Sequence, residues 1–345
     1  MKYSLRTGIS LVTAGLLAAT LLPAQVTAQD TITWRVQSHW PSASSSYSDS
    51  LETLKELLAE RTDGRLQLEL HEAGSLFGSG EIFGAVSRGV LDMGTISPAY
   101  EMDRLSTAGV VYGLPNAFKN VWEAAYFYKQ MGIEEMIQEE AAEYDVYYAI
   151  EKVYPTEMVL KEPVESMDDF ESLNIRSSGI LQTFLTEAGA AASMIPGEEL
   201  YQSLQTGVVG GAHWGAVQGA LSMSLYEVAP YHVRPPLNIG GIDAYVISEE
   251  SLNELPEEMQ ETVKNTIEEQ FWRRTNEYIY LEQRALEIAR AEHGVEVIQL
   301  PEEVRARMLE AAQSMWDEEA AKSDRAAEAV EKMREFLAEL GYVEQ

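Results

Sequence analysis

The sequence predicts an α/β fold of two lobes with a ligand-binding cleft between them. Between Thr31 and Ser97, strands and helices alternate at the spacing typical of a parallel α/β sheet. A second series of strands and helices lies between residues 146 and 214, and we expect the chain to cross back near Pro235 and Pro236. Two α/β series joined by crossover strands indicate two lobes, and clefts between domains are a preferred place for small-molecule sites.

The first lobe is predicted to begin with a strand at 31–38, in which Ile32, Trp34 and Val36 alternate with other residues. A serine-rich turn then leads into an amphipathic helix between Tyr47 and Leu58. The next elements expected are a strand at 65–71, a helix at 81–87 and a strand at 90–97.

The middle of the chain continues with a helical stretch at 121–143 and a strand at 146–153. The elements expected after these are a short helix at 167–170, a strand at 173–176, a helix at 180–189, a helix at 199–205 and a strand at 208–214. A strand at 244–248 then returns to the first lobe.

The C-terminal part is predicted to be helical. Pro256 opens a long helix, since proline suits the first helical position, and the helix is expected to run to about Arg290 and to end near Gly294. One apolar stripe of this helix predicts core residues, namely Met259, Val263, Ile267, Phe271 and Tyr278. Alternating charges from Pro301 to about Leu340 predict a last helical region with a solvated exterior face.

The chain start predicts export. Lys2 and Arg6 precede an apolar run at 9–22, and the small residues Val26, Thr27 and Ala28 follow it. This pattern predicts a signal peptide at residues 1–28, cleaved after about Ala28, because the apolar run is short for a membrane span. An uncleaved N-terminal anchor is the alternative. After cleavage we expect no stable insertion in the membrane.

The composition excludes some partners. The chain has 25 Lys and Arg against 56 Asp and Glu, a formal net charge of −31. Nucleic acids and anionic membrane surfaces require basic patches, so neither is an expected partner. The chain has no Cys, so it uses no disulfides although an exported protein has access to them.

The usual signatures of catalysis are missing from the sequence. There is no glycine-rich phosphate loop and no GxSxG motif, and the five His residues are scattered without metal-ligand spacing. We therefore expect a binding protein without a cofactor and not an enzyme.

Arg176 is the strongest candidate for a binding residue. It ends the predicted strand Leu173–Arg176, and open α/β sheets bind ligands at the carboxyl ends of their strands. A guanidinium grips a carboxylate through two parallel hydrogen bonds. One cation at such a place in an acidic chain indicates an anion-binding cleft. The alternative is a structural ion pair with an Asp or Glu.

Several motifs together resemble one family. They are Trp34–Ser38, Val86–Gly94, Gly113–Pro115, Leu173–Arg176 and Leu225–Tyr231, in an order and spacing that span the mature chain. The chain resembles the extracytoplasmic solute-binding proteins of tripartite ATP-independent periplasmic (TRAP) transporters, of the DctP type. The number of residues between Trp214 and Ala229-Pro230-Tyr231 is similar to that in the branch of the family that includes keto-acid binders.

The resemblance implies a periplasmic receptor that binds a small organic carboxylate through Arg176 and hands it to TRAP membrane permease subunits. It implies a two-lobed periplasmic-binding-protein fold with the long helix bridging both lobes. The implied division places lobe I at 29–152, lobe II at 153–237, and the completion of lobe I with the C-terminal helices at 238–345. The other possible functions are a periplasmic enzyme acting on a small organic anion, and a receptor serving a sensor or another importer.

The resemblance also suggests further ligand contacts. Trp214 is expected to be a wall of the binding site, with a core Trp as the alternative. Tyr154 and Thr156 lie on the crossover and are either ligand contacts or plain hinge residues. The remaining candidates are His39 and Trp40 after the first strand, Ser97 and Tyr100 after the third, and Phe77. Each of them either faces the cleft or has only a structural role, in a turn, a helix cap or a helix contact.

The chain departs from that branch beside the candidate Trp and after the second crossover. Where relatives carry acidic residues, this sequence has His213 and Gly215, and then Asn238. Hard cations prefer several oxygen ligands, with carboxylates supplying most of the attraction. We therefore expect no metal ion, and His213 and Asn238 become candidate ligand contacts.

Overall fold

The computed structural model describes residues 31–342. The predicted signal peptide and its cleavage after Ala28 lie outside the described residues. Among residues 31–342, none of the helices has the length and apolar character that a membrane span needs.

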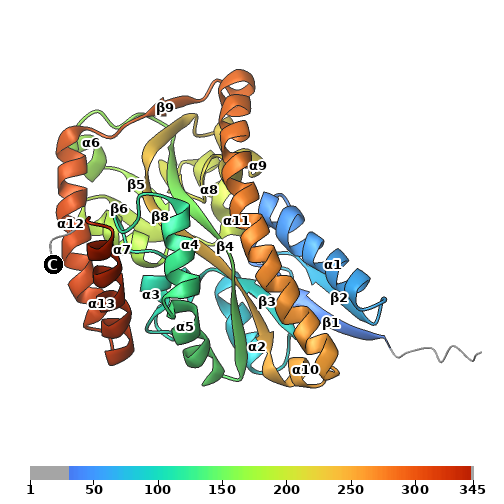
Figure 1. The fold of residues 1–345 in the computed structure, drawn as a ribbon. Coiled ribbons are helices and arrows are strands. Elements are labelled where there is room, and N and C mark those ends of the chain that lie inside the picture. Colours follow the sequence, from blue (N-terminus) through green and yellow to red (C-terminus); the bar gives the residue numbers. More distant parts are fainter. Residues whose placement is uncertain (1–30, 343–345) are drawn as a thin grey trace, which may run out of the picture. The chain divides into compact units, whose positions relative to one another are not determined.

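The described chain is a mixed α/β fold built on one nine-stranded sheet (Figure 1), whose strand order is β2-β1-β3-β8-β4-β7-β5-β6, with β9 beside β8. The strands are β1 (Ile32–Gln37), β2 (Leu66–His71), β3 (Met93–Ile96), β4 (Val146–Leu160), β5 (Asn174–Ser177), β6 (Ala191–Met194), β7 (Gly211–His213), β8 (Tyr231–Ser248) and β9 (Glu296–Ile298). The helices are α1 (Thr53–Arg61), α2 (Ile82–Ser87), α3 (Ala108–Val111), α4 (Val121–Gln130), α5 (Ile133–Ala142), α6 (Met167–Glu171), α7 (Gly179–Glu187), α8 (Leu200–Thr206), α9 (Val217–Ser222), α10 (Glu249–Asn253), α11 (Glu257–His293), α12 (Glu302–Ala320) and α13 (Asp324–Glu339).

The first half-sheet contains β1, β2 and β3 with the adjoining ends of β4 and β8. Strand β1 pairs in parallel with both β2 and β3, as the alternation of strands and helices predicts. Strand β3 pairs antiparallel with β8 at residues 244–247, which confirms the predicted return strand. The alternation in β1 is real, because Trp34 and Val36 are buried and Thr33 and Arg35 are exposed.

Two long strands connect the halves of the sheet. Strands β4 and β8 pair antiparallel from residues 146 and 248 to residues 160 and 231, with irregular register near Lys152 and Thr156. Both extend beyond the sequence prediction, which ended the first at Val153 and placed a crossover at Pro235 and Pro236. The prolines are tolerated inside β8 because residues 234–237 have no strand partner, so their missing N–H groups break no ladder.

The second half-sheet contains β5, β6 and β7 with the other ends of β4 and β8. Strand β5 pairs in parallel with β6 and β7, and β7 pairs antiparallel with β4. The sequence reasoning found β5, α7 and α8 but missed β6 and α9. Strand β6 has the composition Ala-Ala-Ser-Met, which lacks the β-branched and aromatic residues that mark a strand.

The long helix α11 lies along both half-sheets, as predicted (Figure 1). Its stripe Met259, Val263, Ile267, Phe271 and Tyr278 is buried. It packs against α1 beside the first half-sheet, against β4 in the middle, and against α9 beside the second. The two-lobed α/β fold and the bridging helix are therefore confirmed.

Two helical regions differ from the prediction. The stretch expected at 121–143 is two helices, because Gly132 takes a left-handed conformation (φ 79°) between α4 and α5. The last region is also two helices, and it is not only an exterior face. Helices α12 and α13 bury Val304, Met315 and Phe336, among others, since each has an apolar stripe between its charged residues.

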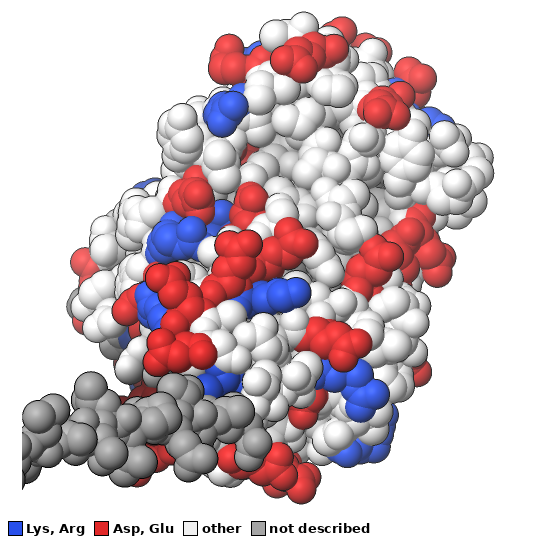
Figure 2. Space-filling model, turned by 90° about the vertical axis from the view of Figure 1, so that its right-hand side faces the viewer, with Lys and Arg blue, Asp and Glu red and all other residues white. Residues whose placement is uncertain are grey.

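Charged residues are spread over the surface. On the face that Figure 2 shows, acidic side chains form several groups with fewer basic ones among them, and an uncharged area lies above. The described surface therefore has no broad basic patch on this face.

Candidate functional site

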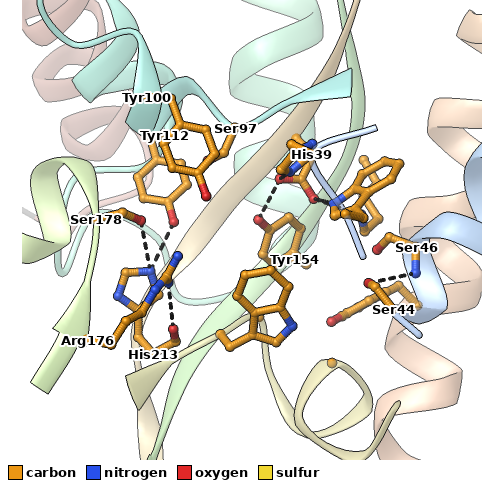
Figure 3. Close-up of a pocket in the computed structure, with 17 residues that line it drawn as sticks. His39, Ser44, Ser46, Ser97, Tyr100, Tyr112, Tyr154, Arg176, Ser178 and His213 are labelled. Carbon is orange, nitrogen blue, oxygen red and sulfur yellow. Dashed lines mark hydrogen bonds and ion pairs between the residues drawn. The ribbon is translucent and has the colours of Figure 1, made fainter. Parts of the chain in front are cut away.

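A cavity lies between the two half-sheets, where the predicted binding residues converge (Figure 3). Eight of the candidates line it, namely His39, Trp40, Ser97, Tyr100, Tyr154, Arg176, His213 and Trp214. Its volume is about 50 Å³, and a water molecule needs about 10–15 Å³ on the same measure. The cavity therefore admits only a small ligand.

The sheet topology explains why these residues meet. Strands β1 and β3 are parallel neighbours, so their carboxyl ends lie at the same edge of the first half-sheet, beside His39 and Ser97. Strands β5 and β7 likewise place Arg176 and His213 at one edge of the second half-sheet. The two edges face each other across the cavity, as expected for ligand sites at the carboxyl ends of parallel strands.

Arg176 is buried, with 2% of its surface exposed, and it has no ion pair with any acid of residues 31–342. Its Nε donates to the backbone oxygen of Ile195 (2.8 Å) and its Nη1 to that of His213 (2.9 Å). The guanidinium carbon lies 5.3 Å from the ring centroid of Trp214. The surroundings orient the guanidinium without neutralising it, and this removes the alternative of a structural ion pair.

His213 is part of the polar wall beside Arg176. Its Nδ1 lies 2.7 Å from Ser177 Oγ, and its Nε2 lies 3.3 Å from the hydroxyl of Tyr112. Burial lowers the pKa of His213 well below its ordinary value, and the charge of Arg176 lowers it further. The imidazole is therefore neutral at physiological pH and adds no second positive charge. Burial also raises the pKa of Tyr112 to about 12, so its hydroxyl keeps its proton.

The opposite side of the cavity holds a buried carboxylate, Asp243 on β8. Its Oδ1 accepts from Tyr154 (3.1 Å) and His39 Nε2 (3.3 Å), and its Oδ2 accepts from Trp40 Nε1 (3.2 Å) and Lys152 Nζ (3.2 Å). Burial alone would raise the pKa of Asp243, but the charge of Lys152 and the bonds from His39 and Lys152 outweigh it and hold the pKa at about 2. Asp243 is therefore ionised and fully bonded.

Sequence reasoning missed Lys152 and Asp243. They are cross-strand partners on β4 and β8, and 91 residues separate them in the chain. A signal was present, because the pair Glu151-Lys152 interrupts an apolar strand and Asp243 precedes the apolar run 244–247. Charged residues in otherwise buried strands are functional or structural ion-pair candidates.

Trp214 forms an aromatic wall that two glycines accommodate. A Cβ at Gly197 would lie 2.4 Å from the Trp214 ring, and a Cβ at Gly219 would lie 3.3 Å from it. The ring is half-buried and lines the cavity. A role of Trp214 as a wall of the ligand site therefore stays a prediction.

Three of the predicted residues do not line the cavity. Phe77 exchanges two backbone hydrogen bonds with the amide of Gln37. Asn238 is buried and its Nδ2 donates to the backbone oxygens of Tyr112 and Gly113 (3.2 and 2.8 Å). Thr156 is buried on β4 near Gly241, and its hydroxyl has no hydrogen-bond partner among the described residues. For Thr156 and Asn238, the sequence correspondence did not account for the irregular register of β4 and β8.

Two hydrogen bonds connect segments that belong to the two different predicted lobes. Ser79 Oγ donates to Glu198 Oε2 (3.0 Å), and Gln218 Nε2 donates to Asp49 Oδ2 (3.2 Å). In both pairs one residue lies in the part of the chain before β4 and the other follows β5. The structure is therefore in a form whose cleft is closed.

The chain is similar in sequence to known solute receptors. A monocarboxylate 2-oxoacid-binding periplasmic protein of a Nostoc species is 22% identical over 321 residues, covering 88% of this chain and 84% of that protein. The ectoine-binding periplasmic protein TeaA of Halomonas elongata is 29% identical over 171 residues, covering 47% of this chain and 49% of that protein.

Solved structures share the fold over most of the chain. A TRAP transporter solute-binding protein of Bordetella bronchiseptica, solved with calcium and picolinate, has a TM-score of 0.83 at 21% identity and covers 90% of this chain and 93% of its own. A TRAP periplasmic solute-binding protein of Pseudoalteromonas atlantica, solved with sodium and pyruvate, has a TM-score of 0.83 at 18% identity. The match covers 90% of this chain and 95% of that one.

The family assignment rests on most of the chain. Residues 37–323 match the family described as bacterial extracellular solute-binding protein, family 7. This match begins at Gln37, the last residue of β1, and includes the cavity residues of both half-sheets and helix α11. It confirms the resemblance drawn from the sequence motifs. The chain belongs to the bacterial extracellular solute-binding protein family 7, the DctP family.

Proposed function

We propose that this protein is a periplasmic receptor that binds one small organic monocarboxylate and delivers it to a TRAP-type membrane transporter. The observation that carries the proposal is the buried guanidinium of Arg176, which lines the cavity without an acidic partner among residues 31–342. A buried charge without a counterion is strongly unfavourable. An anionic ligand in the cavity supplies that counterion.

The other buried cations support a single negative charge on the ligand. Lys152 contacts the carboxylates of Glu151 (2.6 Å) and Asp243 (3.2 Å). Arg274 contacts Glu277 (2.8 Å) and lies 3.7 Å from Asp49. Both cations are thus already neutralised, so a second ligand carboxylate would find no available positive charge. This favours a monocarboxylate over a dicarboxylate.

The dimensions and the walls of the cavity narrow the ligand further. A volume of about 50 Å³ accommodates a molecule of a few heavy atoms. The hydroxyls of Tyr100 and Tyr112, kept protonated by burial, are available to a carbonyl oxygen next to the carboxylate. We therefore propose a 2-oxo acid of about the size of pyruvate. The 2-oxoacid-binding relative and the pyruvate-bound neighbour support this choice.

The site geometry favours binding without chemistry. Ser177 and His213 are within hydrogen-bond distance, as a nucleophile and its base would be. However, Ser177 is completely buried and does not line the cavity. His213 has a strongly lowered pKa, whereas an efficient general base has a pKa near the working pH. These features support a receptor and not a hydrolase.

Export and domain motion complete the proposal. The N-terminal pattern supports a signal peptide cleaved after about Ala28, and the family supports a periplasmic location. We propose that lobe I (29–152 and 238–345) and lobe II (153–237) rotate about the irregular middle of β4 and β8, as hinged receptors do. The closed form would then be the one that the membrane permease recognises.

Mass spectrometry of small molecules released from the unfolded purified protein tests the ligand directly. Calorimetry should then show binding of pyruvate and much weaker binding of succinate and of the neutral amide of pyruvic acid. If the amide bound as tightly as pyruvate, the proposed role of the Arg176 charge would be wrong. If succinate bound as tightly as pyruvate, the proposed limit to one carboxylate would be wrong. Uptake by vesicles that contain the cognate permease should require the receptor and the same acid.

A further inference from the structure

The cavity provides no suitable place for the metal ions that accompany ligands in related structures. Two neighbours were solved with calcium or sodium beside picolinate or pyruvate. Among the residues that line this cavity, Asp243 supplies the carboxylate, and all four of its acceptor positions are taken by Tyr154, His39, Trp40 and Lys152. No group of three or more His, Asp or Glu able to hold a metal occurs within residues 31–342.

The ammonium of Lys152 lies between two carboxylates at one end of the cavity. Its Nζ lies 2.6 Å from Glu151 Oε2 and 3.2 Å from Asp243 Oδ2, which bracket it between two carboxylates. It also lies 5.0 Å and 4.9 Å from the ring centroids of Trp40 and Tyr154, at distances typical of cation–π contacts. Lys152 is 1% exposed and lines the cavity.

We propose that Lys152 is a resident counterion that leaves the carboxylate of the cavity, Asp243, unable to hold a metal ion, so that this receptor binds its carboxylate ligand without calcium or sodium. This rests on the proposed function, because it assumes that the organic acid enters this cavity. The ammonium holds Asp243 in place, and Asp243 in turn positions His39, Trp40 and Tyr154 at the end of the cavity opposite Arg176.

The proposal has a specific consequence for a variant that lacks the ammonium. In Lys152→Gln, Glu151 and Asp243 become two buried carboxylates without their shared cation. Calcium binds carboxylate oxygens at about 2.3–2.6 Å. Glu151 Oε2 already lies 2.6 Å from Nζ, whereas Asp243 Oδ2, at 3.2 Å, would have to move closer to the ion. The variant should therefore acquire a calcium site that the natural protein does not have.

Lys129 offers a matched control outside the cavity. Its ammonium is also buried between two carboxylates, Glu134 (2.6 Å) and Glu268 (2.5 Å), and lies 4.4 Å from the centroid of the Phe271 ring. Lys129→Gln removes the same kind of group at a place that does not line the cavity. It controls for a general loss of stability and for calcium binding to an acid pair away from the ligand, because Glu134 and Glu268 do not line the cavity.

The experiment uses calorimetry with calcium chloride alone on chelator-treated protein, followed by pyruvate with and without calcium. We expect no stoichiometric calcium binding to the natural protein and equal pyruvate affinity in both conditions. Lys152→Gln should bind one calcium ion, and its pyruvate affinity should fall about tenfold or more without calcium and recover when calcium is added. Lys129→Gln removes a similar ammonium away from the cavity, so its pyruvate affinity should match that of the natural protein both with and without calcium.

Two results would overturn the proposal. The first is a natural protein that binds one calcium or sodium ion and needs it for pyruvate, whatever the variants do. The second is a folded Lys152→Gln protein, judged by its melting curve, that binds no calcium. If the natural protein fails to bind pyruvate, the ligand assignment is wrong, while titration with calcium alone still decides the role of Lys152.

Discussion

Replacing Arg176 with Gln should weaken ligand binding far more than it weakens the ligand-free fold. The substitution leaves the backbone oxygens of Ile195 and His213 without their donors, which costs about 1–3 kcal/mol each. It also removes an unpaired buried charge, which relieves a desolvation penalty of several kcal/mol. These effects oppose each other, so the free energy of unfolding without ligand should change by less than about 2 kcal/mol.

The effect on binding has no such compensation. A buried charge pair broken on one side loses about 2–5 kcal/mol, so the Kd for pyruvate should rise by roughly thirtyfold or more. Arg176→Lys should recover only part of this affinity, because an ammonium lacks the planar fork that fits a carboxylate.

Arg274 is the natural comparison. It is also completely buried, but it pairs with Glu277 and does not line the cavity. Arg274→Gln should lower the free energy of unfolding by about 3–5 kcal/mol and leave the affinity of the folded protein nearly unchanged. Urea unfolding and calorimetry on both variants measure the contrast. An Arg176→Gln protein that is as destabilised as Arg274→Gln, yet binds with natural affinity, would refute the reasoning.

Two further substitutions test the Trp214 wall of the cavity and the hydrogen bond between Ser79 and Glu198. Gly197→Ala places a Cβ 2.4 Å from the Trp214 ring, and such overpacking costs about 1–3 kcal/mol. We expect this variant to show altered tryptophan fluorescence and weaker pyruvate binding. The control Gly80→Ala, whose new Cβ has no neighbouring atom within 4 Å, should change neither property. Glu198→Ala removes the hydrogen bond that Ser79 donates between the two predicted lobes, which stabilises the closed form by about 0.5–1.5 kcal/mol. Stopped-flow measurements should show two- to tenfold faster ligand release, and an unchanged rate would contradict a role in closure.

Local sequence patterns were sufficient for the first half-sheet. The alternation of Trp34 and Val36 located β1, and the apolar stripe of the long helix from Met259 to Tyr278 located α11. Both are short-range signals, since a strand face and a helix face repeat every two and every 3.6 residues. The same holds for Arg176, whose place at a strand end was visible in its own segment.

The rest of the site depends on contacts that no local pattern contains. Lys152 and Asp243 meet because β4 and β8 pair along their whole length, and the irregular register between them decides which side chains reach the cavity. The same irregularity places Asn238 against the backbone of Tyr112 and keeps Thr156 away from the cavity lining. Such pairing between distant strands is fixed only when the whole sheet forms.

Helix α11 also determines how the molecule unfolds. Its first turns bury Met259 and Val263 in the core beside the first half-sheet, and its last turns bury Leu286 and Ala289 in the core beside the second. Neither core is complete without this one continuous helix, so neither half should survive as a separately expressed fragment. Thermal melting should accordingly show one cooperative transition for both lobes, and a bound ligand should raise its midpoint as a whole.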